Sequence, residues 1–250
     1  RILCEFFGLC RDFECDIMLY LPKIRLFMIH HDTPSHRFDR LFDAKFLHAP
    51  KTVQDQDRQN IFQSLTANTP LFLEIGAGKG KHAMQFAGLN ADKHLIAIER
   101  TREKFNAFQK QAALGELNNL TFVHADAITF CVHFIAPNSL DGVFILYPNP
   151  EPHNKNQRWL NMPFFEFLLS RLKAGGFVRI ASNIESYIDE ACQLLDEVWR
   201  LPYTKYAIDS TSARTHFEIK YLARGELCQE IILTKPACYQ TRFDDTPVKE

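Results

Sequence analysis

The chain has 250 residues, of which 46% are apolar, and a formal net charge of −1. This length and composition are ordinary for a folded domain with one large core. The near-zero charge gives no global attraction to nucleic acid, so any RNA or DNA contact needs a local basic surface. The seven cysteines include no C-x-x-C pair. We expect them to be reduced thiols, in a cytoplasmic protein that binds no metal.

The first 32 residues are rich in aromatic side chains, but charged residues interrupt every apolar run. No run reaches the length of a signal-peptide core or a membrane span, so we expect neither export nor membrane insertion. The pattern divides the chain into an N-terminal segment whose order is left open (1–50), one folded domain (51–236) and a C-terminal tail (237–250).

Short apolar runs alternate with helical patterns along the folded domain. It opens with a helix that Asp55 or Asp57 caps. Strands are predicted at 71–76, 94–99, 120–126, 141–150, 177–183, 215–222 and 227–234. Helices are predicted after the first strand through Phe86, over 101–117 with Thr101 as cap, around 162–172 with Gly175-Gly176 closing it, and over 184–199. This alternation predicts an α/β fold with a doubly wound, mostly parallel sheet and an antiparallel edge.

Three glycines at alternate positions follow the first strand. Gly76, Gly78 and Gly80 form a G-x-G-x-G turn between a strand and a helix. Without Cβ atoms they let backbone amides approach a ligand closely, which is typical of nucleotide-cofactor loops. A merely tight turn would explain one or two glycines but not three in alternation, so we expect cofactor binding here.

Acids stand at or near the ends of three successive strands. Glu74 precedes the glycines, Glu99 ends the second strand and Asp126 ends the third. Glu99 is placed to accept hydrogen bonds from the hydroxyls of a ribose, and Asp126 to accept one from the amine of an adenine. Each acid alone would more often be a helix cap or a solvated strand end, but the series favours a cofactor that contains adenosine.

A nicotinamide dehydrogenase has a similar glycine loop and a ribose-binding acid. Its motif is G-x-G-x-x-G, whereas the third glycine here comes one residue early and Lys81 stands in its place. Glu74 would also repel a pyrophosphate. S-adenosylmethionine carries a sulfonium and an ammonium group and no phosphate, so an acidic rim favours it. The residues therefore indicate an S-adenosylmethionine-dependent methyltransferase.

The fourth strand ends in a proline-rich segment, Y-P-N-P-E-P-H, at residues 147–153. In such a sheet this end lies beside the reactive group of the cofactor. An ordinary turn would also be rich in proline, but the position favours a role in the reaction. We expect Asn149 to act there, in contact with both cofactor and acceptor.

The order of LFLEIGAGKG, YPNP, ASN and RTHFEIKYLARGE resembles the bacterial tRNA (guanine-N7)-methyltransferases over residues 50–235. The resemblance implies a seven-stranded, Rossmann-like sheet of the class I methyltransferases, with tRNA as partner and S-adenosylmethionine as cofactor. It implies cofactor contacts from Glu74, Glu99 and Asp126. The implied substrate-binding residues are His153, Lys155, Arg158, Asn183, Thr215, Phe217 and Glu218.

Thr215 to Glu218 match a T-x-F-E motif of the family in full. The resemblance implies that Glu218 accepts a hydrogen bond from the Watson–Crick edge of a guanine and that Thr215 contacts a base or phosphate. Lys155, Arg158 and Arg214 are candidates for phosphate contacts.

Other positions depart from the family pattern, as in a divergent paralogue. Asn149 and Asn183 stand where the family has acids, Glu151 replaces a Trp and His153 a Lys. Guanine N7 is nucleophilic in the neutral base, so methyl transfer to it needs in-line positioning more than a strong base. The purine becomes cationic during transfer, and an amide stabilises that charge less than a carboxylate does.

The methyl acceptor therefore stays open between several alternatives. Asn149-Pro150 also partly resembles the N-P-P-[Y/F] loop of amino-group methyltransferases. The alternatives to guanine N7 are an exocyclic amine of another RNA base, a small molecule, or no transfer at all in a non-catalytic RNA-binding module.

Overall fold

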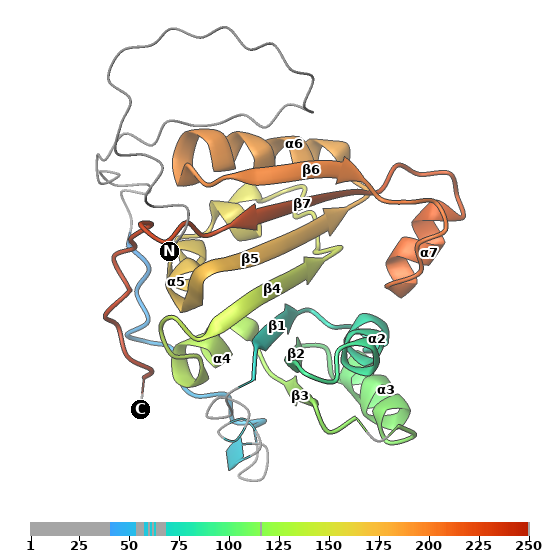
Figure 1. Cartoon of the computed structure of the whole chain (residues 1–250), viewed down its shortest axis with the longest axis horizontal. Helices are drawn as coiled ribbons and strands as arrows, with labels where there is room; N and C mark the ends of the chain where they lie inside the picture. Colours follow the sequence, from blue (N-terminus) through green and yellow to red (C-terminus); the bar gives the residue numbers. More distant parts are fainter. Residues whose placement is uncertain are drawn as a thin grey trace, which may run out of the picture. The chain divides into compact units, whose positions relative to one another are not determined.

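The computed structural model describes residues 41–53, 58–59, 61, 63, 69–115 and 117–249 (Figure 1). These residues belong to one compact unit of the chain. The predicted caps Asp55 and Asp57 lie outside the described residues, although the described positions between 58 and 63 are helical. Within the described ranges, no helix is long and apolar enough to cross a membrane.

A seven-stranded sheet with the order β3-β2-β1-β4-β5-β7-β6 forms the centre of the fold. Every neighbouring pair from β3 to β5 is parallel, whereas β7 runs antiparallel to both β5 and β6. This confirms the predicted doubly wound, mostly parallel sheet. The strands are β1 (Leu71–Ile75), β2 (His94–Glu99), β3 (Leu120–His124), β4 (Leu140–Leu146), β5 (Leu172–Ser182), β6 (Tyr203–Ala207) and β7 (Gln229–Thr234).

Helices cover both faces of the sheet. They are α2 (Lys81–Leu89), α3 (Arg102–Ala112), α4 (Ala127–Phe134), α5 (Phe164–Arg171), α6 (Glu185–Leu194) and α7 (His216–Leu222), with the short turns η1 (Lys155–Gln157), η2 (Trp159–Asn161) and η3 (Leu195–Trp199). Side chains of β1 point alternately to the two faces, so Leu73 packs in the core of α4, α5 and α6 while Phe72 packs in that of α2 and α3. Because both faces are covered, all of β1 is buried and its sequence is a continuous apolar run except for Glu74.

Four parts of the predicted element order were wrong. Helix α4 was not predicted. Residues 216–222 form helix α7 rather than a strand, and β6 was missed. Gly175 and Gly176 lie inside β5 rather than after a helix. They sit at an irregularity where Leu140 pairs with Leu172 and Gly142 with Phe177, so the chain passes from α5 into the strand without a loop.

Residues 236–249 pack on the body of the domain. Phe243 is buried against Phe42 and Phe167, and the buried guanidinium of Arg171 donates to the carbonyls of Phe243 and Thr246. The Lys249 ammonium donates to three carbonyls between residues 44 and 47. The described part of the predicted tail therefore closes the core beneath α5.

Candidate functional site

The glycine loop between β1 and α2 is a left-handed turn at each of its three glycines. The φ angles of Gly76, Gly78 and Gly80 are 78°, 61° and 80°, values that side chains with a Cβ rarely adopt. A Cβ on Gly76 or Gly78 would meet no atom within 4 Å, so both residues border open space. A Cβ on Gly80 would lie 2.0 Å from the ring of the buried Phe108. The first two glycines thus leave room for a ligand, and the third lets α2 pack against α3.

The carboxylate of Glu99 holds this loop in place. Glu99 is the last residue of β2 and is 5% exposed. One carboxylate oxygen accepts from the Gly78 amide at 2.8 Å and the other from the Thr101 amide at 2.6 Å. The residue expected at the ribose therefore lies against the glycine loop, and each oxygen keeps a second lone pair for a ligand hydroxyl.

The loop amides do not form a phosphate-binding nest. The amides of Gly76 and Ala77 both donate to the Ile98 carbonyl at 2.9 Å, and the Gly80 amide donates to the Ala77 carbonyl. With the Gly78 amide held by Glu99, four amides of the turn are used within the protein. A dinucleotide loop instead directs such amides at a pyrophosphate. The geometry therefore weighs against a nicotinamide cofactor.

Glu74 is a buried acid in β1, two residues before the glycine loop. It is 3% exposed, and its carboxylate lies 2.9 Å from Nδ1 of His82 on α2. The His82 ring packs edge-on against Phe144 of β4, with centroids 4.8 Å apart. The sequence did not single out His82, which lies in the first turn of α2.

Asp126 follows β3 by two residues and caps α4. Its Oδ1 accepts from the amides of Ile128 and Thr129 at 3.0 and 3.1 Å. The cap uses one carboxylate oxygen, so the capping role does not by itself compete with an adenine contact through Oδ2.

The segment after β4 is held in a strained conformation. Tyr147 and Glu151 have φ angles of 53° and 44°, which are unfavourable for residues with a side chain. Asn149 lies exposed between them, and its amide donates to Glu151 at 2.8 Å. The Tyr147 amide donates to Ala181 of β5, which ties the segment to the neighbouring strand.

Each of the two asparagines has a carboxylate beside it. Asn183 directly follows β5, and its amide donates to Glu226 at 2.6 Å. Asn149 donates to Glu151 in the same way. Negative charge is therefore present at the ends of both β4 and β5, although acids are absent at positions 149 and 183. The role of Glu226 was missed because it comes from a segment 43 residues further along the chain.

Glu218 lies in a buried network of charges and is 0% exposed. Its carboxylate accepts from Ser212, from the Arg214 guanidinium and from the Tyr147 hydroxyl, the last at 2.9 Å. Arg214 also pairs with Glu230 of β7 at 2.5 Å. Burial opposes ionisation, but the hydrogen bonds from Arg214 and Ser212 outweigh it and hold the pKa of Glu218 below its ordinary value.

The predicted contact of Glu218 with a base does not fit this geometry, because both its oxygens face protein donors. The Thr215 hydroxyl accepts from the Glu218 amide at 2.9 Å as the cap of α7, which uses a lone pair and not its O–H, so its contact with a base or phosphate stays a prediction. Arg214 is likewise turned inward, toward Glu218 and Glu230. Phe217, by contrast, is 41% exposed.

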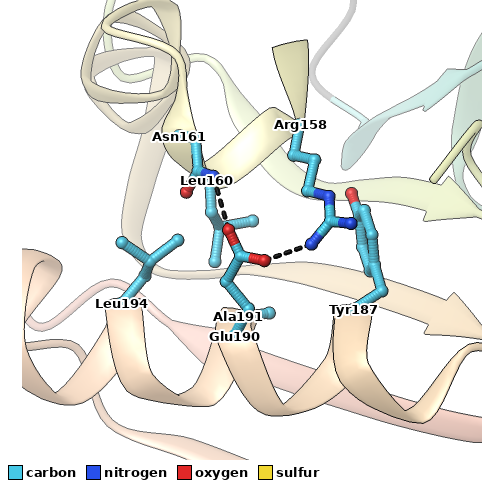
Figure 2. A pocket seen from close by; sticks show the side chains of 7 residues that line it. All are labelled: Arg158, Leu160, Asn161, Tyr187, Glu190, Ala191 and Leu194. Atoms are coloured by element: carbon cyan, nitrogen blue, oxygen red, sulfur yellow. Dashed lines mark hydrogen bonds and ion pairs between the residues drawn. The ribbon is translucent and has the colours of Figure 1, made fainter. Parts of the chain in front are cut away.

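Arg158 anchors the loop after β4 to α6 and does not point outward. It is 8% exposed, pairs with Glu190 and donates to the Pro150 carbonyl at 2.7 Å. Figure 2 shows its guanidinium beside the Tyr187 ring in a small pocket, where the Asn161 amide also donates to the Glu190 carboxylate. The predicted phosphate contact of Arg158 therefore does not fit, whereas His153 and Lys155 are exposed.

The described residues contain no group of three or more His, Cys, Asp or Glu side chains arranged to hold a metal ion.

Comparison with known proteins agrees with this geometry. Residues 68–230 match the model of a family described as a putative methyltransferase. A tRNA (guanine-N(7)-)-methyltransferase of Nitrosomonas europaea is 30% identical over 226 residues, which are 86% of this chain and 98% of that protein. The chain belongs to this methyltransferase family. A protein of the same name from Nitrosomonas eutropha is 28% identical over 224 residues, with the same coverage of both chains.

Solved structures of methyltransferases share the fold. A 16S rRNA methyltransferase superposes with a TM-score of 0.57, at 17% identity, over 75% of this chain and 98% of its own. An antibiotic-related methyltransferase superposes with a TM-score of 0.54, also at 17% identity, over 74% of this chain and 96% of its own. The predicted class I methyltransferase fold is thereby confirmed, as is the predicted family.

Proposed function

We propose that this methyltransferase takes S-adenosylmethionine as its donor and methylates N7 of a guanine in tRNA. The observation that carries the proposal is the loop in which Glu99 binds the Gly78 amide beside open space at Gly76. This arrangement suits a cationic, phosphate-free nucleoside. The relatives named tRNA (guanine-N(7)-)-methyltransferase support the choice of acceptor.

The cofactor would lie against the carboxyl ends of β1, β2 and β3. Glu99 would bind the ribose hydroxyls, Asp126 the adenine amine, and Glu74 would add negative charge near the cationic end. The loop of Gly76, Gly78 and Gly80 would border this site: the first two leave room for the ligand, and the third lets α2 pack against α3. When bound, S-adenosylmethionine supplies a methyl group on a positively charged sulfur, which is an electrophile that needs no metal.

The acceptor side would be formed by the segments after β4 and β5. Asn149 and Asn183 present amides there, each beside a carboxylate, Glu151 or Glu226. We propose that these two carboxylates stabilise the positive charge that the purine gains. His153, Lys155 and Phe217 are exposed and complete the candidate substrate surface.

The decisive experiment incubates the purified protein with total tRNA and S-adenosylmethionine labelled on its methyl group, and then identifies the labelled nucleoside. Labelled 7-methylguanosine is the expected product. A methylated exocyclic amine would move the assignment to amino-group chemistry, which the Asn149-Pro150 pair also allows. If the protein binds the cofactor but labels no tRNA, the proposed acceptor is wrong for the tRNAs present.

Replacing Glu99 with Ala should weaken cofactor binding by about 1–3 kcal/mol, because a charge-assisted acceptor for the ribose is lost. The Gly78 amide would also lose its partner, so the loop would be less ordered. Isothermal titration calorimetry with S-adenosylmethionine measures the change. The exposed Glu103 in the first turn of α3 provides the control, and Glu103→Ala should leave the affinity unchanged. Equal affinities for the wild type and Glu99→Ala would contradict the proposed site.

A further inference from the structure

Helix α7 carries two aromatic rings on one side. Phe217 and Tyr221 are four residues apart and therefore lie on the same face of the helix. Their ring centroids are 6.0 Å apart and the ring planes differ by 17°, so the two rings are stacked. Phe217 is 41% exposed and Tyr221 is partly exposed. The two rings are thus nearly parallel neighbours, and Phe217 is the more exposed of the two.

Lysine ammonium groups lie over both rings. Lys104, from α3, has its Nζ 5.9 Å from the centre of Phe217, and Lys220 has its Nζ 5.9 Å from the centre of Tyr221. Within the described ranges, neither lysine takes part in an ion pair. The aromatic surface is therefore positively charged, although the whole chain is nearly neutral.

The surface begins next to the segment that follows β4. The ring centroids of Tyr221 and Tyr147 are 5.8 Å apart, and Tyr147 comes two residues before Asn149. The Tyr147 hydroxyl is bound by Glu218 of the same helix. In Figure 1, α7 lies on the side toward which the arrowheads of β4 and β5 point. A ligand on the two rings would therefore lie near the proposed acceptor site.

We propose that Phe217 and Tyr221 form a stacking platform for an unpaired RNA base next to the base that is methylated. This inference rests on the proposed function in taking RNA as the acceptor. Aromatic rings flanked by lysines are the usual means of holding unpaired bases: the rings stack on the base and the ammonium groups attract the phosphates. A duplex keeps its bases stacked on each other, so the platform selects unpaired nucleotides.

The platform explains an exposed surface that the fold itself does not need. The only buried residue of α7 is Glu218, so Phe217 and Tyr221 add little to the core. Stacking on an aromatic side chain tolerates any base, so the platform would position the acceptor without reading the sequence of its neighbour.

The test uses a short, unstructured RNA that contains one 2-aminopurine, whose fluorescence is quenched when it stacks. Binding to the wild type should quench the signal. Phe217→Ala should reduce the quenching and weaken binding about 5- to 150-fold, which is the range for loss of one base–aromatic stack. Phe217→Trp should restore both. Ile219→Ala, which removes an exposed aliphatic side chain of the same helix, serves as the matched control and should change neither.

Three results would overturn the platform. The first is equal RNA affinity and quenching in the wild type and in Phe217→Ala. The second is a loss of S-adenosylmethionine affinity in Phe217→Ala, which would place the adenine of the cofactor on the ring instead. The third is a difference in molar mass between the wild type and Phe217→Ala in light scattering. This would show that α7 forms a contact between two copies of the chain.

The RNA binding test does not depend on methyl transfer. If the wild type quenches the probe through Phe217 but labels no tRNA, the platform stands and the proposed acceptor fails. If the wild type labels guanine N7 and Phe217→Ala retains full RNA affinity, the proposed function stands and the platform fails.

Discussion

Gly80 combines a positive φ with a crowded position, and no amino acid with a side chain suits both conditions. A Cβ there would be strained at φ 80° and would also meet the buried Phe108 ring. Gly80→Ala should therefore reduce the free energy of unfolding by about 2–4 kcal/mol. Urea denaturation measures it.

Gly88 is the matched control for this substitution. It lies in α2, its φ is not positive, and a Cβ there would meet no atom within 4 Å. Gly88→Ala should leave stability unchanged or raise it by up to about 1 kcal/mol, because Ala has the higher helix propensity. Equal effects of the two substitutions would show that neither the φ angle nor the contact with Phe108 restricts residue 80.

For single residues, the sequence predicts a role where that role depends on neighbours in the chain. The alternating glycines predict a loop that a ligand can approach closely, because glycine has no Cβ, and the structure has open space at Gly76 and Gly78. Glu226 and His82 were not found, because their partners, Asn183 and Glu74, are brought to them only by the fold. The sequence also could not show that Arg158 and Glu218, both charged, are buried against partners of opposite charge.

Helix α7 is attached to the domain by charge more than by apolar packing. Glu218 is its one buried residue, and its pKa lies below the ordinary value. A lowered pKa means that ionised Glu218 adds stability above the pKa of an unfolded glutamate, about 4.3. This stability is lost as the pH falls through the lower pKa of the folded state.

Glu218→Gln should reduce the free energy of unfolding at pH 7 by roughly 2–3 kcal/mol, because the charged hydrogen bonds to Arg214 and Ser212 are lost. The deficit should shrink in the acidic range, where wild-type Glu218 becomes protonated. Urea denaturation across that range measures both effects. The exposed Glu197→Gln should differ from the wild type by less than about 0.5 kcal/mol. A deficit that does not change with pH would argue against the ion pair.

The wrong prediction for α7 has an identifiable cause. Along 215–222, Thr, Phe, Ile and Tyr alternate with more polar residues, which is the period of a strand. The signal in favour of a helix was the T-x-x-E spacing of a capping box, of which the structure forms the Thr215 half. The central strands β1, β2 and β4 were predictable because burial on both faces leaves continuous apolar runs.

The segment that follows β7 contributes to the stability of the whole domain. Phe243 is 7% exposed in the core formed with α5, and Phe243→Ala should lower the free energy of unfolding by about 3–5 kcal/mol. Phe46→Ala removes the same side chain where it is 78% exposed and should cost less than about 0.5 kcal/mol. Thermal or urea denaturation compares the two. Similar small losses for both would mean that residues 236–249 do not close the core.

The place of β7 in the sheet has a consequence for biosynthesis. β6 is made before β7 but pairs with it alone among the described strands, and β7 also fills the edge of β5. While a ribosome adds residues 208–234, which are 27 residues, at about 5–20 residues per second, β6 and the edge of β5 stay unpaired for seconds. Open strand edges attract other chains. The nascent protein is therefore most exposed to aggregation just before Thr234 leaves the exit tunnel, and this is when a chaperone would be of most use.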